Sequence, residues 1–194
     1  METVTVNKYN FEELSEESKE RARDWWKDNG IGEHESEEIT ESFKNQLKSL
    51  GLPSEDVRWK LSSCQGDGVA FYGSVDVEEY LTKNKIKTKF RKLFDSDKDL
   101  LIENVGILKS TSCHMYDHYN TMLVSYNEAL YGGYENTIRE QALEDFVEHL
   151  DDHVKSLSHA FVKEGMENID YLLSDDYVDE CLEQYEFTEE GVLF

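Results

Sequence analysis

The chain has 194 residues, with 43 acidic side chains against 20 basic ones, and its formal net charge is −23. A field of that sign repels nucleic acids and anionic membrane surfaces, and it attracts the basic surfaces that bind nucleic acids. Hydrophobic residues make up 38% of the chain and aromatic residues 12%, which is too many for a disordered acidic tail. We therefore expect a folded protein that binds something basic, without direct contact to nucleic acid or membrane.

The length suits one folded domain spanning residues 1–194, because a chain of this size can bury a substantial core. No apolar run approaches the roughly 20 residues that a membrane-spanning helix needs. The N-terminal residues lack the basic and apolar regions of a signal peptide. Three widely spaced cysteines, Cys64, Cys113 and Cys181, fit reduced thiols better than a disulfide framework. These features predict a cytoplasmic protein.

The N-terminal part predicts a short strand and two helices. Thr3–Val6 is a β-prone stretch and a candidate edge strand. Ser15 is a good helix N-cap, and Gly30 can adopt the left-handed conformation that ends a helix, so a helix is predicted between them. A second helix is predicted over 35–50. Its apolar residues recur at helical spacing: Ile39, Phe43, Leu47 and Leu50.

The middle of the chain begins with a predicted hairpin. Val57–Ser63 and Val69–Ser74 show the alternation of half-buried strands. The segment Gln65–Gly68 between them provides a tight turn, because its glycines allow positive φ. Pairing around this turn would direct Trp59 and Phe71 to the same core.

Two more strands are predicted at Ile102–Lys109 and Thr121–Asn127, after a helical insert over 77–93 in which Ile86, Phe90 and Leu93 are the buried residues. Hairpin-like links between four strands predict an antiparallel sheet with helices on one face.

The last third predicts a long amphipathic helix and a short final helix over 175–185. Seven apolar residues form a stripe that can cover the sheet: Ile138, Ala142, Phe146, Leu150, Val154, Leu157 and Phe161. The expected fold class is therefore α+β, with a four-stranded antiparallel sheet packed against amphipathic helices and a long C-terminal helix.

Residues 135–194 carry 18 acidic side chains against three basic ones. Most of these carboxylates fall outside the apolar stripe and should face water. Carboxylates fixed on a helix can replace phosphates and pair with the Lys and Arg side chains of a nucleic-acid-binding groove. We therefore expect the partner to bind at ten acids of the two helices: Glu140, Glu144, Glu148, Asp151, Asp152, Asp175, Asp176, Asp179, Glu180 and Glu183.

Two runs of residues contain metal-ligand types. Cys113–His118 offers thiolate, imidazole and carboxylate groups, but its spacing matches no structural zinc motif. In the second run two histidines lie one helical turn apart, a spacing that permits chelation, and they also flank the apolar stripe. The weak candidates are His114, Asp117, His118, His149 and His153. A polar loop and packing beside the core are the favoured interpretations, so we expect no metal and no cofactor.

The segment Lys83–Lys92 is a basic island with three interpretations: contact with an acidic partner, contact with the chain's own acidic helix, or a solvated helix face. Gln65–Gly68 lacks the Gly-Lys-Ser/Thr ending of a phosphate loop, and the sequence contains no Gly-x-Ser-x-Gly elbow. Because nothing in the sequence argues for catalysis, we expect the protein not to be an enzyme.

Four segments resemble a family of small, acidic phage and prophage proteins without established activity: Tyr9–Trp25, Ser63–Ser74, Tyr171–Asp176 and Glu186–Gly191. The resemblance covers most of the chain in outline and brings no catalytic residues with it. It implies a phage-encoded protein in the cytoplasm of a bacterial host, where small accessory phage proteins often block host defence.

Together, the resemblance and the charge lead us to expect an inhibitor of a bacterial defence nuclease, either a CRISPR or a restriction effector. It would act as a DNA mimic on a basic nucleic-acid-binding surface. The alternatives are an antitoxin-like or general acidic interaction protein and, further behind, a metal-dependent hydrolase.

Overall fold

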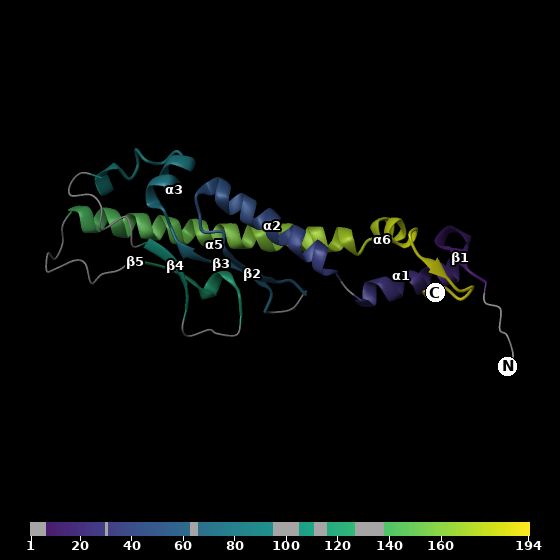
Figure 1. Cartoon of the computed structure of the whole chain (residues 1–194). Helices are drawn as coiled ribbons and strands as arrows, with labels where there is room; N and C mark the ends of the chain where they lie inside the picture. Colours follow the sequence, from purple (N-terminus) through teal and green to yellow (C-terminus); the bar gives the residue numbers. More distant parts are fainter. Residues whose placement is uncertain (1–6, 30, 63–65, 95–104, 111–115, 127–137) are drawn as a thin grey trace. The chain divides into compact units, whose positions relative to one another are not determined.

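In the computed structural model, the described residues are 7–29, 31–62, 66–94, 105–110, 116–126 and 138–194. The contacts divide the chain into two compact units, which are described in turn (Figure 1). Unit 1 comprises residues 1–37 and 166–194, and unit 2 comprises residues 38–165. Helices α2 (Glu33–Leu50) and α5 (Ile138–Leu172) contribute residues to both units. In the described ranges, no helix combines the length and the hydrophobicity needed to cross a bilayer.

Unit 2 contains the predicted four-stranded antiparallel sheet, with the strands in sequence order. The strands are β2 (Asp56–Lys60), β3 (Gly68–Ser74), β4 (Val105–Lys109) and β5 (Met122–Tyr126). The α+β class and the antiparallel sheet are therefore confirmed. Parts of the predicted strands and turn, at 63–65, 102–104 and 127, lie outside the described residues.

The predicted hairpin of β2 and β3 is confirmed by its register. Val57 pairs with Phe71 and Trp59 pairs with Val69, which places Trp59 and Phe71 on one face of the sheet. Phe71 is fully buried, whereas Trp59 is half-buried and donates its indole N–H to Thr40 Oγ1 at 2.9 Å.

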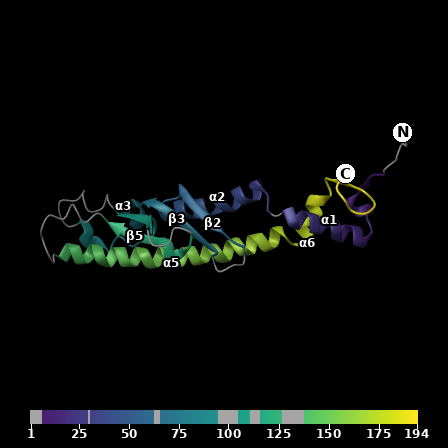
Figure 2. The ribbon, with the colours of Figure 1, turned by 90° about the horizontal axis from the view of Figure 1, so that it is seen from below.

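The core of unit 2 forms where α2 and α5 pack on that same face (Figure 2). The ring of Phe161 on α5 stacks on Phe43 of α2 with centroids 4.8 Å apart, and it meets Phe71 of β3 edge-on at 6.2 Å. In the predicted α5 stripe, Ala142, Phe146, Leu150, Val154 and Phe161 are buried, Leu157 is half-buried, and the side chain of Ile138 is not described.

The predicted helical insert over 77–93 is wrong as a single helix. Helix α3 ends at Lys83 (Val77–Lys83), and a separate 3₁₀ turn, η2, covers Arg91–Phe94. Asn84 caps α3, and Lys85 has a φ of 58°, which a helix cannot continue through. Of the three residues predicted to be buried, Phe90 and Leu93 are buried, whereas Ile86 is half-buried.

A second feature of the sheet is the partial seam between β3 and β4. Within the described ranges these strands pair at Gly73 with Ile107 and at Ser74 with Gly106, and the N–H of Val75 donates to the carbonyl of Val105 at 2.9 Å. Below that point, two side chains replace the missing strand partner. Ser158 Oγ of α5 donates to the carbonyl of Val69 at 2.5 Å, and the N–H of Phe71 points to the sulfur of Met122 at 3.3 Å. Backbone groups buried in the seam are thus satisfied by helix and strand side chains.

Unit 1 is built from α1 (Glu16–Asn29), α6 (Asp175–Leu182), the 3₁₀ turn η1 (Phe11–Glu13) and two short strands. Strand β1 (Tyr9–Asn10) pairs antiparallel with β6 (Glu186–Phe187), a sheet that the sequence did not indicate. The predicted strand at Thr3–Val6 and the predicted C′ glycine, Gly30, lie outside the described residues.

The core of unit 1 joins the two ends of the chain. Six buried side chains form it: Phe11, Leu14, Ala22, Val178, Leu182 and Phe187. Ser18 Oγ of α1 donates to the carbonyl of Glu189 at 2.7 Å. The segments Tyr9–Trp25 and Glu186–Gly191 therefore meet in one unit, and their side chains Phe11, Leu14, Ala22 and Phe187 contribute to its core.

Candidate functional site

The acidic residues predicted on the long helix belong to the first half of α5, in unit 2. Glu144, Glu148 and Asp152 are exposed. Asp151 is half-buried and accepts an ion pair from Lys155 Nζ at 2.5 Å, one helical turn further on. The side chain of Glu140 is not described. Helical periodicity explains the arrangement, because these positions lie off the apolar stripe that packs on the sheet.

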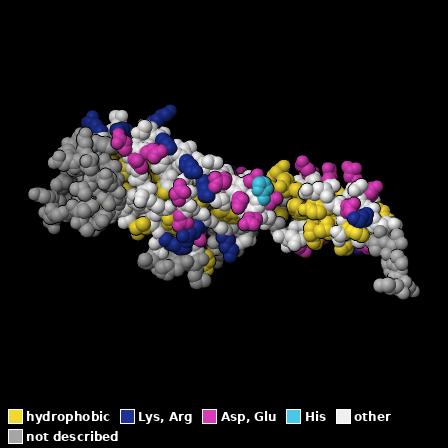
Figure 3. Space-filling view, in the orientation of Figure 1, with side chains coloured by type: hydrophobic (Ala, Val, Ile, Leu, Met, Phe, Trp, Pro, Cys, Tyr) yellow, Lys and Arg dark blue, Asp and Glu magenta, His cyan; other side chains and the backbone are white. Residues whose placement is uncertain are grey.

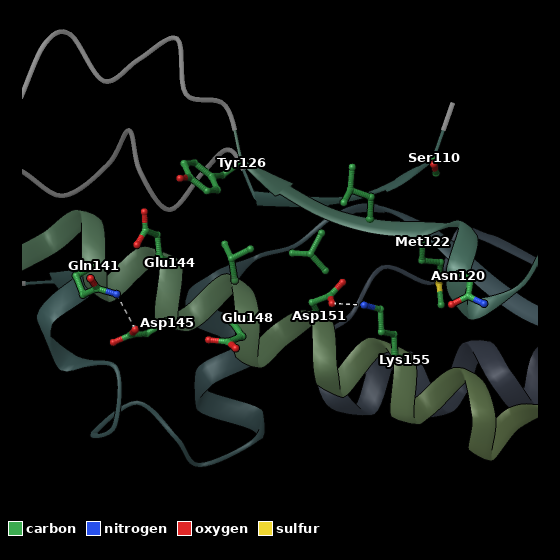
Figure 4. A pocket seen from close by; sticks show the side chains of 13 residues that line it. Ser110, Asn120, Met122, Tyr126, Gln141, Glu144, Asp145, Glu148, Asp151 and Lys155 are labelled. Carbon is green, nitrogen blue, oxygen red and sulfur yellow. Dashed lines mark hydrogen bonds and ion pairs between the residues drawn. The ribbon is translucent and has the colours of Figure 1, made fainter. Parts of the chain in front are cut away.

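A groove of about 580 Å³ runs between this helix and strand β5 (Figure 4). The strand side contributes Met122, Leu123, Val124 and Tyr126, with Ser110 and Asn120 beside them. The helix side contributes Gln141, Glu144, Asp145, Val147, Glu148, Asp151 and Lys155. In Figure 4 Asp151 and Lys155 lie under the strand and Glu144 points toward its Tyr126 end, whereas Gln141 and Asp145 lie to one side. The groove is thus apolar along the strand and acidic along the helix.

The electrostatics of this groove are strongly negative. Four carboxylates line it, from Glu144, Asp145, Glu148 and Asp151, against the ammonium of Lys155. That ammonium is engaged by Asp151. The amide of Gln141 donates to Asp145 Oδ1 at 3.1 Å. Glu144 and Glu148 remain exposed, and such a groove concentrates cations and basic side chains.

The five predicted acids of α6 and its C-cap, Glu183, lie in unit 1 and are not equivalent to one another. Asp179 accepts both Nε and Nη2 of Arg23 at 2.6 Å, and Asp175 accepts Lys27 Nζ at 2.6 Å. The hydrogen bond from Lys27 lowers the pKa of Asp175, and the bond to Asp179 raises the pKa of Arg23. The three other candidates, Asp176, Glu180 and Glu183, are exposed. Two of the five charges are therefore neutralised within the unit.

The candidate metal ligands near the middle of the chain have other partners. Asp117 Oδ1 accepts Lys109 Nζ at 2.8 Å and lies 3.4 Å from the hydroxyl of Tyr72. His118 Nδ1 accepts the backbone N–H of Asn120 at 3.2 Å, which caps the 3₁₀ turn η3 (Tyr119–Thr121). Cys113 and His114 lie outside the described residues.

This loop lies against the sheet. A Cβ on Gly68 of β3 would lie 2.3 Å from the carbonyl oxygen of Asp117, so the strand can approach the loop backbone only with glycine there. The Gly68 position of the resembling segment is thereby explained as a packing requirement.

His149 and His153 on α5 face the core side of the helix. The His149 ring lies against Phe90, and His153 Nδ1 is 2.7 Å from the hydroxyl of Tyr80. Burial lowers the pKa of both histidines and raises the pKa of Tyr80 to about 12. Within the described ranges, no three His, Cys, Asp or Glu side chains come together as a metal site.

The basic segment Lys83–Lys92 pairs in part with its own neighbourhood. Lys83 pairs with Glu79, and Lys87 pairs with Glu78, both of α3. Lys89 Nζ lies 4.9 Å from the ring centroid of Phe90. Among the three interpretations given by the sequence, these contacts favour an exposed surface whose charges are partly balanced locally.

Sequence reasoning missed the strand side of the groove. It placed the partner on helix carboxylates and gave no role to β5, which forms the outer edge of the sheet. A signal was present in the sequence, since Met122–Tyr126 contains no charged residue. The other edge strand, β2, has three charged residues among its five.

The surface of unit 1 is of a different kind. Figure 3 shows hydrophobic side chains gathered on its visible face, beside a row of acidic ones. Exposed apolar residues of this unit are Trp25, Tyr171, Val192, Leu193 and Phe194. The rings of Trp25, Trp26 and Tyr185 meet edge-on at 6.1–6.5 Å.

Comparisons with known proteins identify no relative of this chain. The chain matches no protein-family model, no curated protein and no solved structure.

Proposed function

We propose that the protein inhibits a bacterial defence nuclease, a CRISPR or restriction effector, by binding its basic nucleic-acid surface in the host cytoplasm. The observation that carries the proposal is the groove between β5 and α5, where four carboxylates face a single, already paired ammonium. A basic surface that normally binds phosphates would gain charge-assisted hydrogen bonds there. Because the same surface serves both ligands, the protein would exclude nucleic acid by competition.

The rigidity of α5 supports this mode of binding. Phe146, Leu150 and Val154 anchor the helix in the core of unit 2, so the backbone positions that carry the neighbouring carboxylates are fixed. Glu144 and Glu148 are one turn apart, which spaces them by about 6 Å along the axis. Fixed charges lose less conformational entropy on binding than charges on a mobile segment.

The proposal places the main contact on α5 and a minor one on α6. Asp175 and Asp179 already neutralise Lys27 and Arg23, so a partner would have to break those pairs to use them. Asp176, Glu180 and Glu183 carry exposed charge and add to the long-range attraction of a basic partner.

The test is inhibition measured against defined effectors. Strains that each carry one CRISPR or restriction system would be infected with a sensitive phage, with and without the protein. We expect the wild-type chain to restore plaque formation in at least one strain. The double variant Glu144→Lys and Glu148→Lys should lose that effect. The control double variant, Glu20→Lys with Asp170→Lys, makes the same change in charge at exposed sites outside the groove, and it should still restore plaque formation.

Two results would contradict the proposal. One is wild-type protein that protects the phage in no strain of the panel. The other is a groove variant that inhibits as well as the wild type. An antitoxin-like role would instead be indicated if the chain rescues growth only when one particular basic toxin is expressed with it, and if that rescue fails in the groove variant.

A further inference from the structure

The two edges of the sheet in unit 2 differ in a way that concerns binding. Natural edge strands usually carry charges or prolines that prevent pairing with another chain. Strand β2 follows this rule with Asp56, Arg58 and Lys60, whereas β5 (Met122–Tyr126) has neither a charge nor a proline. Among the described residues, no strand pairs with the outer side of β5.

The hydrogen-bond alternation of β5 identifies the groups on that outer side. The N–H of Ser110 donates to the carbonyl of Thr121 at 2.8 Å, so these two groups point toward each other across β4 and β5, while the N–H of Thr121 donates to the carbonyl of His118. In an antiparallel ladder the bonded pairs alternate, so Leu123 and Ser125 also direct their backbone groups toward β4. Val124 therefore directs its N–H and C=O away from β4, and Met122 directs its C=O the same way, whereas the N–H of Met122 donates to the carbonyl of Tyr119. A further strand would meet these outward groups of Val124 and Met122.

The two faces of the sheet at this edge have different chemistry. On the face toward α5 lies the groove with Glu144, Glu148 and Asp151. On the opposite face, Leu108 and Leu123 are directly paired across β4 and β5 and are 52% and 53% exposed. A strand added to β5 would place alternate side chains over the acids and beside the leucines.

We propose that the outer edge of β5 receives an extended basic segment of the partner as a fifth strand of the sheet. Lys or Arg at every second position would face α5, and apolar residues at the intervening positions would continue the row of Leu108 and Leu123. This inference rests on the proposed function and specifies the shape of the basic partner. Pairing of extended segments with a sheet edge is an established mode of peptide recognition.

The spacing of the two elements is compatible with this arrangement. Side chains on one face of a strand repeat about every 6.6–6.8 Å. Glu144 and Glu148 are spaced by about 6 Å along the helix, so successive basic residues can reach successive carboxylates. A second copy of the chain is disfavoured as the occupant, because it would bring two acidic grooves together in a protein of net charge −23.

The test compares three capped seven-residue peptides on the full-length protein by isothermal titration calorimetry. The first alternates Lys and Val, the second has the same composition with Lys and Val in separate blocks, and the third alternates but carries backbone N-methyl groups on the pairing edge. We expect the first to bind about tenfold or more tightly than the other two. Its binding should also slow hydrogen exchange at the amide of Val124.

A charge-reversed pair of variants locates the site. Glu148→Lys should weaken the alternating peptide about tenfold, whereas Asp170→Lys, an exposed site elsewhere on α5, should not. Equal binding of all three peptides would overturn strand addition. If Glu148→Lys weakened all three in that case, the peptides would bind the acidic groove by charge alone. Failure of the alternating peptide to bind, or equal binding by Glu148→Lys, would also overturn the inference. Normal peptide pairing without phage protection in any strain would instead contradict the proposed function.

Discussion

Arg23 on α1 and Asp179 on α6 form a forked ion pair, in which Nε and Nη2 of the guanidinium lie 2.6 Å from different carboxylate oxygens. The pair joins the two helices of unit 1, and Lys27 and Asp175 form a second link between them. Total charge therefore overstates the charge that a partner can meet, because part of it is used inside the protein. Asp175 and Asp179 of α6 are used in this way, whereas Glu144 and Glu148 of α5 line the groove and are exposed.

Replacing Asp179 by Asn should destabilise unit 1 by about 1 kcal/mol, because a two-bond, charge-assisted contact is lost at a partly exposed site. Glu180→Gln, at the next position of α6, removes an exposed charge and should change the free energy of unfolding by less than about 0.5 kcal/mol. Urea unfolding followed by hydrogen exchange of the α1 and α6 amides would measure both. Equal effects of the two variants would show that the fork adds no stability.

The sequence predicted the elements with strong periodicity and missed those that depend on contacts between distant residues. The alternation around Val57 and Phe71 was enough to predict the first hairpin and the shared face of Trp59 and Phe71, and the structure adds the register. Strands β1 and β6 are two residues each, and they exist because Phe11 and Phe187 pack in one core. Nothing local at Tyr9 or Glu186 indicates that pairing.

The candidate site was predicted to the same extent. The positions of Glu144 and Glu148 off the apolar stripe could be read from helical spacing, and both are exposed. The engagement of Asp175 and Asp179 could not be predicted, because Lys27 and Arg23 are about 150 residues away in the chain. The groove could not be predicted either, since it requires the placement of β5 beside α5.

Ser158 provides a test of the seam between β3 and β4. Its hydroxyl is fully buried and donates to the carbonyl of Val69, which no described residue of β4 pairs with. Ser158→Ala should therefore lower the free energy of unfolding of unit 2 by about 1–3 kcal/mol, the cost of an unsatisfied buried acceptor. Ser156→Ala, at an exposed position of the same helix, should have almost no effect. A neutral Ser158→Ala variant would mean that the Val69 carbonyl does not depend on this bond.

Gly191 provides a corresponding test in unit 1. It has a φ of +79°, and a Cβ there would lie 2.1 Å from the carbonyl oxygen of Ser18. Gly191→Ala should destabilise unit 1 by about 2 kcal/mol or more, because strain and a backbone clash add. Gly32→Ala is the control, since its Cβ would meet only the flexible side chain of Glu35. Guanidinium unfolding monitored by the fluorescence of Trp26, which packs on the unit 1 core, would separate the two.

The histidines on the core side of α5 predict how stability depends on pH. Burial lowers the pKa of His149 and His153, with smaller contributions from Lys89 to the first and from His149 to the second. In the unfolded chain both imidazoles titrate near about 6.5. Between that value and the lowered folded pKa, the unfolded state binds more protons than the folded state. The contribution of the two neutral imidazoles to the free energy of unfolding is therefore fully present above about pH 6.5, and it is lost as the pH falls through the folded pKa values.

The free energy of unfolding should accordingly decrease between pH 7 and pH 5, by at most about 1.4 kcal/mol per pH unit for each histidine. Replacing both His149 and His153 by Asn should make this dependence shallower, even if the variant is less stable at every pH. Ser156→Asn, at an exposed and non-titrating position of the same helix, is the control and should leave the slope unchanged. Urea titrations at half-unit steps of pH would measure the slopes. Tyr80, whose pKa burial raises to about 12, keeps its proton throughout this range and can donate to His153 Nδ1 whenever that imidazole is neutral.

An unchanged slope in the double variant would show that these imidazoles do not control the acid sensitivity of unit 2.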